Sequence, residues 1–342
     1  MHATWYAILA AMLTAWAVLD GFDFGAGIVQ RIVARTDEER GMVLAAIGPV
    51  WDGNEVWLIA AGGVFVFAFP RAYAVAFSGM YLAIFMVLWL LVFRGMAIEL
   101  RGQIPHPLWR TGWDGTFTLA STVLALVAGV ALGNVIRGVP IDRTGWFHLD
   151  LFALGGVGAI DAYTGFIGLV AVVLLAAHGA AYLTWKTDGE LRERCVAMAR
   201  RAWAIALVVT AGATLATGFE RPDLLAALGR RPWVWPAPAI AVASAVVVLR
   251  ALGRGADRRA FAASSAFIAS LLLATAGVLY PALLPSTLGR ELDITADAAA
   301  SGHHGLVLGL TWWIPALLLA VLYFANLFRS MRGRVRTGEY GH

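Results

Sequence analysis

The sequence predicts an all-α membrane protein, a bundle of about nine transmembrane helices, and three observations lead to this prediction. The chain has 342 residues, of which 60% are hydrophobic and only 14% are charged, whereas an ordinary soluble domain has about 25% charged residues. Nine apolar segments are long enough to cross a bilayer, which takes about 20 residues. The basic residues are also divided unequally between the two sides of these segments. Together these features exclude a soluble globular enzyme, a disordered chain and a disulfide-rich secreted domain.

The apolar segments follow one another without an intervening soluble domain, so we expect one integral-membrane domain over residues 1–342. The first segment lacks a cationic leader and is longer than a signal-peptide core, which predicts an uncleaved helix. The eighth ends at the motif Tyr280-Pro281, where proline cannot continue the helical hydrogen bonds. In chain order the expected helices are Trp5–Val33, Ala46–Phe69, Tyr73–Ala97, Thr116–Ile136, Ala162–Trp185, Trp203–Phe219, Val234–Leu249, Phe261–Leu284 and Gly305–Phe328.

The loops give the orientation of the bundle. One side carries only 7 of the 26 basic residues, and the other side carries the remaining 19. The positive-inside rule places the richer side in the cytoplasm, so the N-terminus is expected outside and the C-terminus inside. The basicity therefore reflects membrane topology rather than binding to nucleic acid. The basic residues of the poorer side are Arg71, Arg137, Arg143, Arg221, Arg230, Arg231 and Arg290.

Ionisable side chains inside the first three spans are the candidate functional residues, because such groups are costly in a bilayer and are usually functional there. The first two spans each contain a pair of acidic residues spaced i,i+3, which places both members on one helix face. The third span ends in two arginines and a glutamate. These candidates are Asp20, Asp23, Asp52, Glu55, Arg94, Glu99 and Arg101.

The expected topology brings these groups to the cytoplasmic leaflet, where they should meet as one cluster. Acids that lie close together share protons and titrate as a set, which suits a proton pathway from the cytoplasm. Asp20 and Asp52 are expected to be the deeper members, whereas Asp23 and Glu55 could lie at the lipid headgroups. The alternative is a buried ion-pair network that only fixes the register of the helices.

The histidines and the single cysteine limit which cofactors this chain could bind. His178 is the only histidine inside an expected span, and it is a candidate proton relay or haem ligand, with a hydrogen-bonded packing residue as the alternative. A haem held by two histidines between helices needs a second deep histidine. The single cysteine, Cys195, excludes an internal disulfide and a cysteine-based metal site. We therefore expect no catalytic residue, bound cofactor or metal site in this chain.

At these same residues the sequence resembles subunit II of the cytochrome bd-type quinol oxidases. The resemblance covers essentially the whole chain and is strongest in its first third. The matching stretches include Asp20-Gly21-Phe22-Asp23-Phe24-Gly25, the run Gly48-Pro49-Val50-Trp51-Asp52-Gly53-Asn54-Glu55-Val56-Trp57, Arg94-Gly95, His178-Gly179-Ala180-Ala181-Tyr182-Leu183 and Tyr280-Pro281.

The resemblance implies an enzyme that oxidises membrane quinol, reduces dioxygen to water and builds a proton gradient without pumping, in the bacterial cytoplasmic membrane. In such enzymes subunit I carries the b- and d-type haems, while subunit II pairs with it, carries no haem and helps to deliver protons. Asp52 matches the family's acid in the Trp-Asp-Gly-Asn motif, and Glu55 stands where some members have glutamine.

The resemblance also implies partners: subunit I, membrane lipids and, in some enzymes, a small single-helix accessory subunit. A structural quinone or lipid could lie between the helices, and no nucleic acid is expected. Two other functions stay open on the residues alone. A proton-coupled secondary transporter would place its ion site near the bilayer midplane, often between inverted repeats, and a scaffold would use its acids only to hold helices together.

Overall fold

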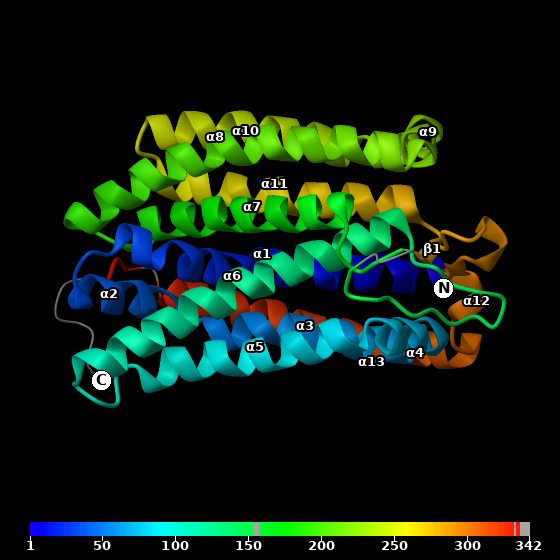
Figure 1. Ribbon diagram of the computed structural model, residues 1–342, viewed down its shortest axis with the longest axis horizontal. Helices are drawn as coiled ribbons and strands as arrows, with labels where there is room; N and C mark the ends of the chain where they lie inside the picture. Colours follow the sequence, from blue (N-terminus) through cyan, green and yellow to red (C-terminus); the bar gives the residue numbers. More distant parts are fainter. Residues whose placement is uncertain (153–156, 332, 336–342) are drawn as a thin grey trace.

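The computed structural model describes residues 1–152, 157–331 and 333–335, and it confirms an all-α bundle of long, roughly parallel helices (Figure 1). Within these residues, eight helices are long and apolar enough to cross a membrane. They are α1 (His2–Val33), α5 (Tyr81–Leu100), α6 (Pro107–Arg137), α7 (Ala162–Lys186), α8 (Gly189–Glu220), α10 (Pro236–Gly253) with the preceding 3-10 turn η1 (Pro232–Val234), α11 (Asp257–Leu279) and α13 (His303–Ser330).

The expected second span corresponds to α3 (Trp51–Ala68), which is not among those eight helices and carries Asp52, Asn54 and Glu55 in its first two turns. The expected start of this span at Ala46 is wrong. Residues Asp37–Ile47 form a separate helix, α2, which begins with a capping box in which Thr36 and Glu39 bond to each other's backbone N–H groups. Such a box satisfies N–H groups that have no partner inside the helix.

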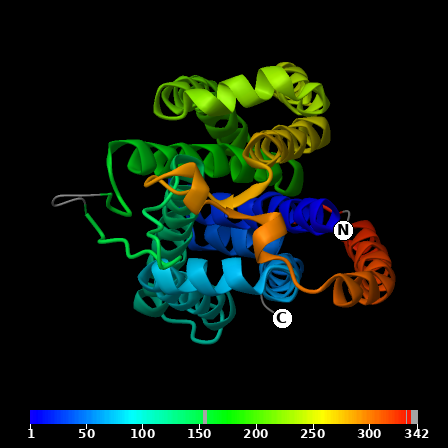
Figure 2. The same ribbon diagram turned by 90° about the vertical axis from the view of Figure 1, so that its right-hand side faces the viewer.

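The expected third span is divided into a short helix, α4 (Pro70–Gly79), and the spanning helix α5. The ring of Phe147 packs against the end of α4 so closely that a Cβ on Gly79 would lie 2.3 Å from it. This contact brings a distant part of the chain against the end of α4. Figures 1 and 2 show α4 lying across the right-hand end of the bundle.

The expected eighth span ends earlier than predicted, at Leu279, although the helix stop at Tyr280-Pro281 is confirmed. The next residues form a strand, β1 (Ala282–Leu284), which pairs antiparallel with β2 (Ile294–Thr295). Three further short elements lie at the same end of the bundle as this hairpin (Figure 2): α9 (Pro222–Arg230), η2 (Arg290–Leu292) and α12 (Ala296–Ala299).

Helix α1 is central and packs against α3, α6, α7 and α11. Its crossing with α7 depends on two glycines, because a Cβ on Gly25 would lie 1.9 Å from the carbonyl oxygen of Leu175, and a Cβ on Gly179 would lie 2.2 Å from the carbonyl carbon of Gly25. Helix α1 begins at the right-hand end of Figure 1 and α13 ends at the left-hand end. The chain therefore crosses the bundle an odd number of times.

One side of the bundle is formed by α3, α5 and α13 (Figure 1) and is named here the α3/α5/α13 face. Only 11% of the apolar window of α5 and 6% of that of α13 are buried inside this chain, against 67% for α7. On α3 five exposed positions form a stripe at helical spacing: Asp52, Val56, Ile59, Gly63 and Val66. This face thus combines a broad apolar surface with a carboxylate.

Candidate functional site

Arg94 of α5 is the centre of the candidate site. Its Nη2 lies 2.7 Å from Oδ1 of Asp20 on α1 and 2.6 Å from Oε1 of Glu55 on α3. Its guanidinium also stacks over the ring of Phe24, 4.5 Å from the centroid. Arg94 and Asp20 are completely buried. One cation therefore joins three helices and partly neutralises two carboxylates inside the helix bundle.

A second pair of contacts extends this group, which we name the Arg94 cluster: Asp20, Asp23, Asn54, Glu55 and Arg94. The amide of Asn54 donates to Oδ2 of Asp23 at 2.8 Å and to the backbone carbonyl of Leu19 at 3.2 Å. The indole N–H of Trp16 donates to the other oxygen of Asp20, Oδ2, at 2.9 Å. Asp23 is thus held by a neutral donor, whereas Asp20 is held by both a cation and a neutral donor.

Burial within the cluster decreases toward the α3/α5/α13 face. Asp20, Asp23 and Asn54 are inaccessible, Glu55 has 20% of its side chain exposed, and Asp52, one turn earlier on α3, is exposed. The expectation that Asp52 is a deep member and Asp23 a solvated one is therefore wrong. On α1 both members of the i,i+3 pair are buried, whereas on α3 Glu55 points inward and Asp52 is exposed.

Several buried polar atoms of the cluster have no hydrogen-bond partner among the described residues. They include Oδ1 of Asp23, Oδ1 of Asn54, and Nε and Nη1 of Arg94. Buried polar groups in folded proteins are ordinarily bonded either to protein groups or to water. The cluster therefore offers donors and acceptors beyond those it uses internally.

Arg101 lies in a separate ion-pair network, so the expected single cluster is divided in two. Seven residues separate Arg101 from Arg94, or roughly 10 Å along a helix. Arg101 Nε lies 2.6 Å from Oδ1 of Asp114 on α6, and its Nη2 lies 2.7 Å from Oδ1 of Asp37 on α2. Arg40 lies 3.0 Å from Asp114, and Arg110 also pairs with Asp37.

This second network ties the short helix α2 to α5 and α6 at the end of the bundle that is rich in arginine. Partial burial raises the pKa of Asp37, but the guanidinium groups of Arg110 and Arg101 outweigh it and hold that pKa below its ordinary value. Glu99 belongs to neither network: its side chain is exposed, and its backbone carbonyl accepts a hydrogen bond from Gln103.

His178 lies on another side of α1 and is fully buried. Its Nε2 lies 3.0 Å from the carbonyl oxygen of Val18, and its Nδ1 lies 2.7 Å from the hydroxyl of Ser264 on α11. The ring also stacks on Phe261. Because both ring nitrogens face protein groups, neither is directed at a haem iron, and this position fits the packing alternative. In the described part of the chain, no three metal-ligating side chains converge on a metal site.

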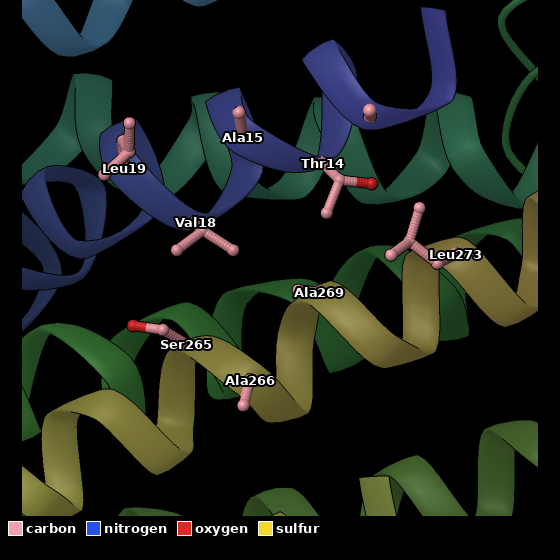
Figure 3. A pocket seen from close by; sticks show the side chains of 9 residues that line it. Thr14, Ala15, Val18, Leu19, Ser265, Ala266, Ala269 and Leu273 are labelled. Carbon is pink, nitrogen blue, oxygen red and sulfur yellow. The ribbon is translucent and has the colours of Figure 1, made fainter. Parts of the chain in front are cut away.

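A shallow apolar groove of about 390 Å³ lies between α1 and α11. Figure 3 shows Val18 and Leu19 of α1 facing Ala266 and Ala269 of α11 across it. The hydroxyl groups of Thr14 and Ser265 are the polar side-chain groups in its lining. The groove suits a hydrocarbon chain, and it provides no charged group for a polar ligand.

Sequence reasoning missed Trp16 and Asn54 as partners of the buried carboxylates. Trp16 could have been found, since it precedes Asp20 by four residues and so lies on the same helix face. It also missed Asp37, Arg40, Arg110 and Asp114. Their signal was weaker, because α2 was expected to be part of a loop and Asp114 lies before the expected start of its span.

Known proteins match nearly the whole length of the chain. The family model described as cytochrome bd terminal oxidase subunit II matches residues 1–331. The chain is 32% identical to the cytochrome bd-I ubiquinol oxidase subunit 2 of Escherichia coli strain K12, with 97% of this chain and 94% of that relative covered. It is 28% identical to the cytochrome bd ubiquinol oxidase subunit 2 of Bacillus subtilis, with 90% and 88% covered.

The fold also resembles a solved structure. A chain of the bd oxidase from Geobacillus thermodenitrificans superposes with a TM-score of 0.75 at 20% sequence identity. The superposition covers 96% of the present chain and 97% of the other. This likeness concerns the arrangement of the helices, including those that carry Asp20, Glu55 and Arg94.

Proposed function

This chain belongs to the cytochrome bd terminal oxidase subunit II family, and from that premise we propose that it conducts protons toward the oxygen-reduction site of a bacterial quinol oxidase. As a member of this family it is a subunit of a quinol oxidase complex with many membrane-spanning helices. Its partner is subunit I, which carries the b- and d-type haems, and its location is the bacterial cytoplasmic membrane. The chain itself contributes no catalytic residue.

The observation that carries the proposal is the Arg94 cluster, in which burial falls continuously from Asp23 and Asp20 to Glu55. Chains of acidic groups inside membrane proteins commonly act as proton relays. Arg94 lowers the cost of burying Asp20 and Glu55, since an opposite charge at hydrogen-bond distance stabilises each carboxylate. Its free nitrogens and the free oxygens of Asp23 and Asn54 would position water molecules between the carboxylates.

The α3/α5/α13 face is the surface on which subunit I would dock. Facing lipid, Asp52 would carry a charge at the edge of an apolar surface, which is costly. Facing a partner, Asp52 and Glu55 would deliver protons directly into the interface. The low burial of α5 and α13 within this chain supports the same assignment. The partner is therefore expected to cover these two helices.

The described residues of this chain do not fit a haem, because both nitrogens of His178 are engaged by Ser264 and Val18. The groove between α1 and α11 would accommodate the tail of a structural quinone or the acyl chain of a lipid. The family membership favours the oxidase over a proton-coupled transporter.

The test is oxygen consumption by the assembled complex carrying Asp52→Asn or Glu55→Gln. We expect quinol-driven oxygen consumption to fall at least about tenfold in Glu55→Gln. A carboxyl group positioned to transfer a proton contributes a factor of about a hundred or more to the rate. The haem absorption spectrum serves as the assembly control. Glu99→Gln is the matched control, since it removes an exposed carboxylate from neighbouring α5. Unchanged turnover in both Asp52→Asn and Glu55→Gln would contradict the proposal.

A further inference from the structure

A second pocket, of about 330 Å³, lies at the end of the bundle that is poor in basic residues, away from the Arg94 cluster. It is enclosed by α9, the end of α11 and the hairpin of β1 and β2. Four of the seven basic residues expected on that side line it, and the acidic residues of its lining are Asp223 and Asp293. Its arginines are Arg221, Arg230, Arg231 and Arg290. The lining therefore carries a net positive charge.

Both acidic groups are already engaged. Asp223 accepts from Nε and Nη2 of Arg221 at 2.9 and 3.1 Å and also pairs with Arg290. Burial raises the pKa of Asp223, but these two arginines outweigh it and lower the pKa to about 2. Asp293 accepts the backbone N–H of Ser286 at 2.7 Å. Two of the four arginines are thus balanced inside the pocket.

The other two arginines retain donors for an anion. Arg231 Nη1 donates to the carbonyl oxygens of Gly277 and Val278 at 2.9 and 3.0 Å, which fixes its guanidinium against the end of α11. A guanidinium has five N–H donors, and these two contacts use one nitrogen. Arg230, next to it, is exposed. Both side chains line the pocket, and the planar guanidinium of each can donate two parallel N–H bonds to phosphate oxygens.

Surrounding aromatic and apolar side chains place the pocket at the depth of the lipid headgroups. Trp233 and Trp235 are 61% and 53% exposed, and Leu225 of α9 is 52% exposed. Tryptophan gathers at membrane–water interfaces. Helix α9 is short and has apolar side chains on both its buried and its exposed side, and such a helix lies in the plane of the interface. The exposed arginine side chains are then held where lipid phosphates occur.

We propose that this pocket binds the phosphate group of an anionic phospholipid. The inference goes beyond the proposed function and does not depend on it, because the pocket lies across the molecule from the Arg94 cluster. Helices α9 and α5 lie on opposite sides of the bundle in Figures 1 and 2, so a partner docked over α5 leaves the pocket open to lipid. Bidentate contacts between arginine and phosphate would supply the recognition.

The experiment uses the purified, delipidated oxidase complex and follows its thermal midpoint during titration with short-chain phosphatidylglycerol, phosphatidylcholine or inorganic phosphate. The test variant is Arg230→Gln/Arg231→Gln. The control variant is Arg71→Gln/Arg143→Gln, which removes the same charge from exposed positions of the same end outside the pocket. Arg230→Gln alone, at an exposed side chain, provides the test if the double variant does not assemble.

We expect phosphatidylglycerol to stabilise the wild-type and control complexes. In the test variant the lipid concentration needed for half of this effect should rise at least about tenfold, a loss of about 1.4 kcal/mol in binding. Equal stabilisation by inorganic phosphate would overturn the lipid assignment in favour of a soluble anion. Equal stabilisation by phosphatidylcholine, or an unchanged titration in both Arg230 variants, would overturn the proposal altogether.

Discussion

At the scale of single residues, Arg94 determines what the candidate site can do. One of its nitrogens bonds to both Asp20 and Glu55, which belong to different helices. The sequence placed all three residues among the candidates, because ionisable groups inside spans are rare. It could not tell that both acids of α1 are buried whereas Asp52 of α3 is exposed, since that depends on the rotation of each helix about its axis.

Replacing Arg94 by leucine leaves two carboxylates without their cation. Breaking a buried ion pair from one side costs about 3–5 kcal/mol, so we expect a lower thermal midpoint and a lower yield of assembled complex. Arg250→Leu, at an exposed position of α10, is the control. Equal midpoints for the two variants would show that Arg94 is not a structural centre of the cluster.

The lowered pKa of Asp37 predicts that the stability of the protein depends on pH. Its pKa lies below the ordinary value of 3.8 because of Arg110 and Arg101. A depressed pKa in the folded state contributes stability that is full above the unfolded pKa and is lost as the pH falls through the folded pKa. The difference in thermal midpoint between wild type and Asp37→Asn should therefore be constant above about pH 5 and shrink below pH 3.8. A difference that grows on acidification would refute this.

At the scale of elements, apolar segments predicted where the helices are but not all of their ends. The break between α4 and α5 follows Gly79, where the Phe147 ring packs, and a contact between distant segments has no signature in local composition. The separation of Arg101 from Arg94 follows from the rise of a helix alone and could have been predicted. Helix α2 escaped prediction because its capping box precedes only eleven residues of helix.

The crossing of α1 and α7 predicts that Gly25 tolerates no side chain. Gly25→Ala would place a methyl group 1.9 Å from the carbonyl oxygen of Leu175, and overpacking of this kind costs about 1–3 kcal/mol. We expect a lower thermal midpoint and less assembled complex.

Gly112→Ala on α6 is the matched control, because no atom lies within 4 Å of its added Cβ. Alanine favours a helix over glycine by about 1 kcal/mol, so this variant should be neutral or slightly stabilised. Equal loss of stability in Gly25→Ala and Gly112→Ala would contradict the close packing of α1 on α7.

At the scale of the whole molecule, the bundle has two unlike sides. Helix α7 is largely covered by neighbouring helices, whereas α5 and α13 leave most of their surface uncovered. Composition predicted that the helices are apolar, but it does not distinguish apolar residues that face lipid from those that face protein. The carboxylate of Asp52 at the edge of the α3/α5/α13 face is what distinguishes a docking surface from a lipid-facing one.

Cysteine accessibility tests this assignment. The single cysteine, Cys195, is fully buried and can be replaced by serine to give a background without thiols. Ile59→Cys on α3 and Val242→Cys on α10 replace side chains that are 73% and 68% exposed in the isolated chain. With a membrane-permeant maleimide, we expect Val242→Cys to be labelled in the assembled complex and Ile59→Cys to be protected. Equal labelling would place the partner elsewhere.

The most direct test of the central claim is the number of protons taken up from the arginine-rich side for each oxygen molecule reduced. It would be measured in vesicles containing the oriented complex with Asp20→Asn or Glu55→Gln, with Glu99→Gln as control. We predict that proton uptake and oxygen reduction slow together in both cluster variants, while haem content and the control stay at the wild-type level. Wild-type proton uptake in both cluster variants would show that the Arg94 cluster holds the helices together and carries no protons.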